Sequence, residues 1–105
     1  HHAAKAILST VQHYSNSSMC WILGIQHKKD PTALIQWLID THQHIYLCEF
    51  DPSICICLKD LPTPMLAHIK RWAIGEAIPT NSIFFGSFFF IDALYKRNTI
   101  TKGPS

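Results

Sequence analysis

Short apolar segments alternate with polar loops along the chain, and the least polar of them predicts a pair of β-strands. It spans 44–58, HIYLCEFDPSICICL, where β-branched, aromatic and cysteine side chains fill the runs Ile45–Phe50 and Ser53–Leu58. Asp51-Pro52 between the runs is typical of a turn, because proline fixes φ and the aspartate can bond its own turn. Alternation along the runs leaves almost nothing polar on either face. The pattern therefore predicts a β-hairpin in the middle of a sheet, with helices packed on both sides.

The flanking segments predict the other elements by apolar periodicity and by residues that start helices. Asp30 and Pro31 form such a start, and Thr63 and Pro64 repeat it. The predicted strands outside the hairpin are Met19–Gln26 and Ser82–Ser87. The predicted helices are Ala3–His13, one from Pro31 that buries Leu34, Ile35, Leu38 and Ile39, one from Thr63 to about Ile74 that buries Met65, Leu66, Ile69, Trp72 and Ala73, and Phe89–Arg97.

The order of these elements and the length of the chain predict a single α+β domain over residues 1–105. Helices are expected on both faces of a mainly antiparallel sheet. His1-His2 is typical of a purification-tag remnant, no signal-peptide pattern follows it, and the polar tail 98–105 is expected to fray. No apolar run reaches the roughly 20 residues that a membrane helix needs, so we expect no membrane partner.

Composition narrows the class of protein without identifying a ligand. Apolar residues make up 48% of the chain and charged residues 15%, which indicates a folded domain. A net charge of +2 permits a nucleic-acid partner without demanding one, because strong phosphate binders usually have a larger basic excess. The four cysteines, without regular spacing, predict reduced, buried thiols and a reducing compartment. They are Cys20, Cys48, Cys55 and Cys57.

His42 and His44 suggest one catalytic hypothesis, a metal-dependent nuclease of the rolling-circle type. Their spacing puts two imidazoles on the same side of an extended chain, where they could share a metal, and Tyr95 on a later helix would attack the DNA phosphate. Two features disfavour it. Gln43 stands where these enzymes have a hydrophobic residue, and Cys55-Ile56-Cys57 occupies the place where they carry their histidines.

No other pattern predicts catalysis, a cofactor or a bound metal. Cys48, Cys55 and Cys57 could supply thiolates, but alternate residues on a central strand are more often core than zinc ligands. The glycines are scattered, so no phosphate-binding loop is present, and neither a nucleophile elbow nor a carboxylate pair occurs. We therefore expect no small-molecule substrate.

Three short basic pairs leave a surface that binds phosphates and bases as a hypothesis. Lys28-Lys29, Lys70-Arg71 and Lys96-Arg97 are each ordinary solvated surface when taken alone. Loops at one end of a sheet, however, often present groups that contact phosphates and bases. The polar loops 15–18 and 62–64 could lie at the same end.

The chain resembles the origin-binding domain of polyomavirus large T antigen, which is related in fold to the DNA-binding domain of the papillomavirus replicative helicase. The similarity spans about residues 5–100. Four segments carry it: AILSTVQHYSNSSMCWILGI, Lys28 to Ile39, SICICLKD with MLAHIKRWA, and, in character only, SIFFGSFFFIDALYKRN. The resemblance implies a sheet of about five antiparallel strands between helices, without catalysis of its own.

The resemblance also implies sequence-specific binding of double-stranded DNA at a viral replication origin. The domain would then belong to a longer replication-initiator helicase in the host nucleus and would self-associate on DNA. One family loop matches Tyr14–Ser18, with Ser17 in place of a basic residue, and the other matches Leu61–Met65, where the basic residues are absent. The expected DNA-contact residues are Ser15, Asn16, Ser17, Lys28, Lys29, Lys59, Thr63, Lys70 and Arg71.

A third hypothesis is a protein-interaction module that keeps the fold without binding DNA. Trp21, Trp37 or Phe88–Phe90 would then be exposed and form the interface.

Overall fold

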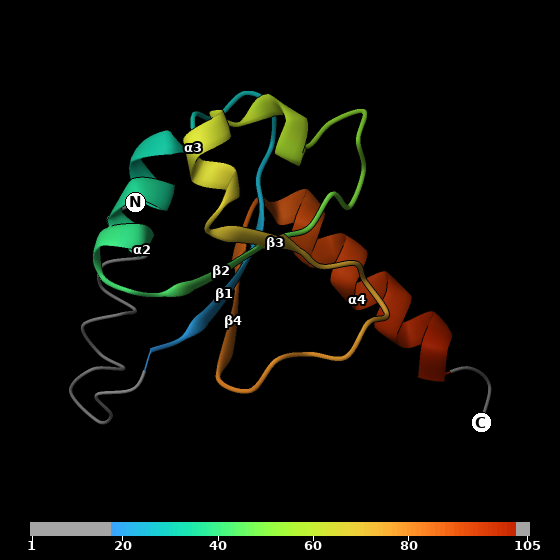
Figure 1. Ribbon diagram of the computed structural model, residues 1–105. Helices are drawn as coiled ribbons and strands as arrows, with labels where there is room; N and C mark the ends of the chain where they lie inside the picture. The colour runs from blue at the N-terminus through green and yellow to red at the C-terminus, as the bar shows by residue number, and fades with distance from the viewer. Residues whose placement is uncertain (1–17, 103–105) are drawn as a thin grey trace.

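Four parallel strands form the centre of the domain (Figure 1). The structure is a computed structural model and describes residues 18–102, with side chains as far as Lys96. The strands are β1 Cys20–Gly24, β2 His44–Leu47, β3 Ile69–Arg71 and β4 Ser82–Gly86, in the order β3-β2-β1-β4 across the sheet. The helices are α2 Thr32–Asp40, α3 Thr63–Leu66 and α4 Phe88–Lys102, with a 3₁₀ turn, η1, at Leu58–Asp60. None of the helices described is both long and apolar enough to cross a membrane.

Each face of the sheet has its own apolar core, because successive strand residues point to opposite sides. Trp21 of β1 and Ile45 of β2 are buried on one face, and Ile22 is buried on the other. The helical residues that cover the first face are Leu34, Ile35 and Leu38 of α2 and Met65 of α3. Phe90 of α4 covers the second face. The sheet therefore lies between α2 and α3 on one side and α4 on the other.

The prediction of a mainly antiparallel sheet of about five strands is wrong, and the predicted hairpin does not form. Its first run contributes β2, but its second run turns away toward β1, where Cys55 makes an isolated antiparallel bridge with Gln26. The turn at Asp51 explains why the hairpin does not form. The carboxylate of Asp51 accepts the N–H of Ser53 at 3.1 Å, and the Asp51 carbonyl accepts the N–H of Cys55 at 2.9 Å. This single helical turn redirects the chain, whereas a two-residue hairpin loop would have returned it alongside β2.

The predicted third helix is wrong beyond its first turn. α3 ends at Leu66, and Ile69 begins β3, where it pairs with Ile45 of β2. Ile69 is buried on the face covered by α2, whereas Trp72 is buried on the opposite face. A helix would direct both side chains to one side. The apolar spacing that predicted a helix therefore serves a short strand and the bend that follows it.

The remaining predicted elements match the structure where it describes them. The predicted strands 19–26 and 82–87 contain β1 and β4, and the predicted apolar face of the second helix is the buried face of α2. The last helix begins one residue earlier than predicted and continues to Lys102. The predicted helix 3–13 lies outside the described residues.

The connection from β3 to β4 passes two strands without a helix. Because β4 lies beyond β1 in the sheet, residues 72–81 run past β2 and β1 on the α4 side. Trp72 anchors this link. Its indole N–H donates to the carbonyl of Ala77 at 3.0 Å, and its ring meets Phe84 edge to face, with centroids 5.6 Å apart. An aromatic ring thus holds the link to the sheet.

β1 and β4 end on two glycines whose backbones are in close contact. Gly24 and Gly86 are register partners. A Cβ on Gly86, whose φ is 157°, would lie 1.9 Å from the carbonyl oxygen of Gly24, and a Cβ on Gly24 would lie 2.1 Å from the ring of Phe90. Neither space admits a side chain. The ends of the two strands and the first turn of α4 pack together because both positions are glycine.

We expect Gly86→Ala to lower the free energy of unfolding by about 3 kcal/mol, because the added methyl group must displace the backbone of β1. Urea unfolding followed by tryptophan fluorescence measures this loss. Gly75→Ala is the matched control: like Gly86, Gly75 is exposed and has a positive φ, of 103°, but it lies in the link between β3 and β4 and pairs with no strand, so the substitution costs only backbone strain, about 1 kcal/mol. Equal losses in the two variants would contradict the close packing at Gly86.

Three of the four cysteines are buried, and all four are free thiols. Cys48, Cys55 and Cys57 belong to the interior, whereas Cys20 is half-buried. Burial, with a smaller contribution from the neighbouring Cys55, raises the pKa of the Cys48 thiol to about 11. Burial also raises the pKa of Cys57 to about 11. The folded domain therefore favours the protonated form of these thiols.

Stability is expected to fall as the pH rises from about 9 to about 11. A thiol in the unfolded chain ionises near pH 9.0, whereas Cys48 stays protonated until its pKa of about 11, so the unfolded state loses its proton first. The contribution of Cys48 to stability is complete below pH 9 and decreases by about 2 kcal/mol across this interval. Urea unfolding at each pH measures the slope. If Cys48→Ala shows the same slope as the original chain, Cys48 is not its source.

Candidate functional site

A groove of about 510 Å³ opens at the carboxyl end of the sheet, between the loops that follow β1 and β4. Grooves of this size accommodate small organic ligands. Its polar groups come from both loops. The β1–α2 loop contributes Gln26, Lys29 and Asp30. On the other side Ser87, which alone joins β4 to α4, lines the groove together with Gly86, the last residue of β4, and Phe88, the first residue of α4.

The groove lies where the direction of winding in the sheet reverses. β1 and β4 are neighbours in the sheet, but the helix after β1 covers one face and the helix after β4 covers the other. The two loops therefore separate as they leave the strands (Figure 1). In open parallel sheets this is the place where ligands bind, outside the carboxyl ends of the strands.

Asp30 supplies a fixed negative charge at the start of α2. Its Oδ1 accepts the backbone N–H of Thr32 at 3.0 Å and also the hydroxyl of Thr32. The hydroxyl bond, and next to it the backbone bond, hold the pKa of the Asp30 carboxyl below its usual range. The amino end of α2 thus already has an anionic partner.

The amino end of α4 has no such partner. The carbonyl of Ser87 accepts the N–H of Ile91 at 3.2 Å, and its hydroxyl receives the N–H of Phe90 at 3.3 Å. The N–H of Ser87 itself donates to the carbonyl of Gly24 at 2.9 Å, which fixes this turn to β1. The first turn of α4 contains no acidic residue. The dipole of α4 therefore favours a negatively charged group in the groove.

Apolar side chains form the rest of the groove. Ile25 and Leu34 are buried beneath it, and Phe85 is partly buried, packed edge to face against Trp21. Phe88 stands at the rim and is 80% exposed. The groove thus combines an apolar wall and a free aromatic ring with a small number of polar groups, which is typical of small-molecule sites.

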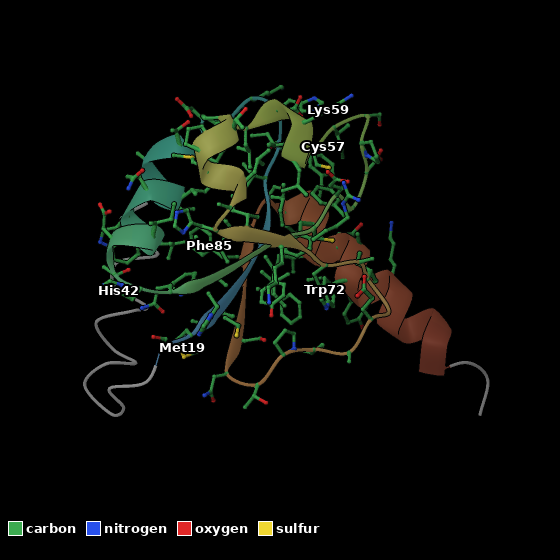
Figure 2. All side chains as sticks on the ribbon, in the orientation of Figure 1. Met19, His42, Cys57, Lys59, Trp72 and Phe85 are labelled. Atoms are coloured by element: carbon green, nitrogen blue, oxygen red, sulfur yellow. The ribbon has the colours of Figure 1, made fainter. Side chains whose placement is uncertain are left out.

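Three of the expected DNA-contact residues lie at this same end of the sheet. Lys28 and Lys29 follow β1 and are exposed. Lys59 is exposed in η1, which the 3.9 Å contact between His27 and Asp60 places beside the β1–α2 loop. Figure 2 shows Lys59 far from His42, which marks the opposite end of the sheet.

The other expected contacts do not gather there. Thr63 is exposed at the start of α3, and Lys70 lines a groove at the amino end of the sheet. Arg71 forms an ion pair with Glu49, with Nε and Oε1 3.2 Å apart. The expected contacts 15–17 lie outside the described residues.

His42 and His44 line the groove at the amino end, but Tyr95 is not part of it. Tyr95 is 72% exposed on α4. Among the described residues, no cluster of three or more histidine, cysteine or acidic side chains is arranged to hold a metal ion. The geometry therefore offers no support for the nuclease hypothesis.

The aromatic residues expected at a protein interface divide into two groups. Trp21 and Phe90 are fully buried and belong to the two cores, so neither can form an interface. Phe88 and Phe89 are exposed on α4, and Trp37 is partly buried against the first core.

The groove between β1 and β4 was not predicted from the sequence. Its signals are an apolar strand that ends in Gly24 and is followed by Lys29 and Asp30, and a second strand that ends in Gly86 and is followed by Ser87 and a helix. Each signal is weak alone. They form one site only when the two strands are neighbours and parallel.

Comparison with protein-family models, with curated proteins and with solved structures found no match for this chain. Its relation to viral origin-binding domains, its place in the host nucleus and its DNA partner therefore stay predictions.

Proposed function

We propose that this domain binds a small anionic ligand of the nucleotide type in the groove between the carboxyl ends of β1 and β4. The observation that carries the proposal is the position of the groove at the point where the helices after two adjacent parallel strands leave for opposite faces. The proposal concerns binding and assigns no catalytic step.

The anionic part of the ligand would occupy the amino end of α4. There the turn at Ser87 is fixed to Gly24 of β1, and no acidic residue follows in the first turn. Lys29 lies on the opposite side of the groove and adds a full positive charge. A phosphate between a helix amino end and a lysine has both the dipole and the charge that favour it.

The apolar part of the ligand would lie along the wall of the groove. Phe88 presents an exposed ring at the rim, and Phe85 and Leu34 lie deeper. A planar base can stack on an exposed aromatic ring. Asp30 is free to accept a hydrogen bond from a ligand hydroxyl with its second oxygen, because its hydrogen bonds to Thr32 both use Oδ1.

The test is an NMR titration with ATP as the probe and adenosine as the ligand that lacks phosphate. ATP should shift the amide signals of residues 24–29 and 86–88, and adenosine should bind at least about tenfold more weakly, because it lacks the charged group. Lys29→Gln should weaken ATP binding by about tenfold. Ala33→Trp should abolish it by filling the groove, since Ala33 is exposed and lines the groove.

Gln36→Trp is the matched control, because Gln36 is exposed on the same helix and does not line the groove. This variant should bind ATP like the original chain. Signal shifts located elsewhere, or an Ala33→Trp variant that still binds, would show that the groove is not the site.

Double-stranded DNA is the second candidate ligand, and the three exposed lysines at the carboxyl end of the sheet favour it. Lys28, Lys29 and Lys59 would attract phosphates without reading sequence. In fluorescence anisotropy, a labelled duplex should bind at low ionic strength, and its affinity should fall steeply with added salt.

Replacement of the three lysines by glutamine should weaken duplex binding at low salt by about tenfold or more. Lys96→Gln provides the control, because Lys96 already pairs with Asp92 at 3.0 Å on α4. If the duplex does not bind at low salt, DNA is excluded as the ligand and only the small-ligand proposal remains.

A further inference from the structure

A second groove, of about 480 Å³, opens at the amino end of the sheet, and histidines dominate its polar lining. His42, His44 and His68 line it together with Lys70 and Tyr46. Figure 2 shows His42 at the end of the molecule opposite Lys59. The function proposed above does not involve this groove.

The register of the sheet brings these side chains together. Tyr46 of β2 pairs with Lys70 of β3, and Ile45 pairs with Ile69, so His44, the first residue of β2, and His68, the residue directly before β3, lie at the same end of the two strands. Side chains two residues apart along a strand point to the same face. His44 and Tyr46 therefore lie on the face opposite Ile45, with Lys70 beside Tyr46, and His68 lies in the turn directly before β3. α4, which covers this face, begins at the other end of the sheet, and the side chains of His44, His68 and Lys70 are exposed.

His42 is held at the mouth of the groove in a left-handed backbone conformation, with a φ of 59°. It follows α2, where its N–H donates to the carbonyl of Ile39 at 3.0 Å and the next N–H, of Gln43, donates to the carbonyl of Leu38 at 2.9 Å. Glycine or asparagine is usual at such a position, because other side chains are strained there. The imidazole is exposed, so burial of the side chain does not offset the backbone strain.

Gln43 makes the turn that carries His42 and His44 rigid. Its Oε1 accepts the backbone N–H of Met19 at 2.8 Å and the indole N–H of Trp21 at 3.2 Å, and its amide nitrogen donates to the carbonyl of Thr41 at 3.0 Å. One side chain thus joins the turn to β1. The positions of the two histidines are fixed before any ligand arrives.

The groove has no negative charge to balance its basic groups. Its lining contains no acidic residue, and within residues 18–102 the side chains of His42, His44, His68 and Lys70 make no hydrogen bond or ion pair. The nearest acidic residue along α2 is Asp40, whose carboxylate accepts the amide of Gln36 at 2.9 Å.

The other titratable groups beside the groove are a thiol and a phenol. On β1 the Cys20 thiol, the register partner of His44, is close enough to feel the charge of Lys70, but burial, the larger effect, raises its pKa. Tyr46 of β2 lines the groove with its phenol. A negative ligand therefore meets the ammonium group of Lys70 and three exposed imidazoles, and imidazole is the side chain that ordinarily gains charge on mild acidification.

We propose that this groove binds an extended anion that carries several phosphate groups, and that binding tightens as the pH falls from about 7.5 to about 5.5. Histidine is the side chain that ordinarily gains charge in this interval. Phosphodiesters keep their charge throughout it, so the change comes from the protein. Because the basic groups are spread over two strands and a turn, one phosphate cannot contact all of them, which favours a chain of phosphates.

The test uses a labelled short oligothymidylate in fluorescence anisotropy at low ionic strength, with inorganic polyphosphate as a competitor. We expect affinity to rise about tenfold from pH 7.5 to pH 5.5, since each exposed charge pair adds only a small factor. The combined variant His42→Asn, His44→Gln and His68→Gln should lose this rise. Lys70→Gln should weaken binding by a similar factor at every pH. Tight binding of oligothymidylate or of polyphosphate alone identifies which of the two sources supplies the phosphates.

His27→Gln is the matched control, because His27 is also exposed but lies beside Asp60 at the carboxyl end of the sheet. It should keep the full pH dependence, as should Ala33→Trp, which fills only the other groove. Circular dichroism confirms that each variant is folded. The proposal is overturned if neither probe binds at pH 5.5, if the combined variant keeps the rise, or if His27→Gln abolishes it.

Discussion

The burial of β1 on both faces determines the rest of this structure. Trp21, Ile22 and Leu23 are fully removed from solvent, so the backbone of β1 must find all its hydrogen bonds within the sheet. It does so with β2 on one side and β4 on the other, both parallel to it. Parallel neighbours require long connections across the faces, and the β1–β2 connection supplies α2, which buries Trp21 from one side. The helix α4, which follows β4, buries Ile22 from the other side. One strand therefore fixes the layers, the neighbours and the position of the ends of the sheet.

The two ends of the sheet then have different chemistry. At the carboxyl end, the amino ends of two helices meet beside Lys29 and an exposed phenylalanine, around a mostly apolar groove. At the amino end, none of the helices within residues 18–102 begins, and imidazoles line the surface. This asymmetry is a consequence of parallel topology, because every strand enters the sheet at the same side and leaves it at the other. An antiparallel sheet would have mixed both kinds of loop at each end.

The sequence predicted local structure well and strand pairing poorly. Helix α2 could be recognised because Leu34, Ile35 and Leu38 repeat with helical spacing after a proline start, and β1 because its apolar run lies between polar loops. The error at 44–58 came from a turn: Asp51-Pro52 predicted a reversal but not its direction. The apolar residues on both sides of that segment are typical of parallel strands buried by helices, and this was the available signal for the correct topology. Ile69 and Trp72 led to the wrong prediction of a longer third helix, because their three-residue spacing suits a helix as well as a strand followed by a bend.

The candidate sites were less predictable than the elements. Lys29 was singled out for its charge and His42 and His44 for their spacing, but the groups that surround them come from distant parts of the chain. Gly86 and Ser87 join Lys29 only through the pairing of β1 with β4, and His68 joins His44 only through the pairing of β2 with β3. Because these sites form only when the correct strands pair, they could not be predicted while the predicted strand pairing was wrong.

The pairing of β1 with β4 has a consequence for the synthesis of the chain. Cys20 begins β1, but its partner Ser82 and the covering residue Phe90 are made more than sixty residues later. Until they emerge from the ribosome, β1 has one open edge and one uncovered apolar face, and both attract other unfinished chains. The sheet can therefore close around β1 only after residues 82–90 have been synthesised.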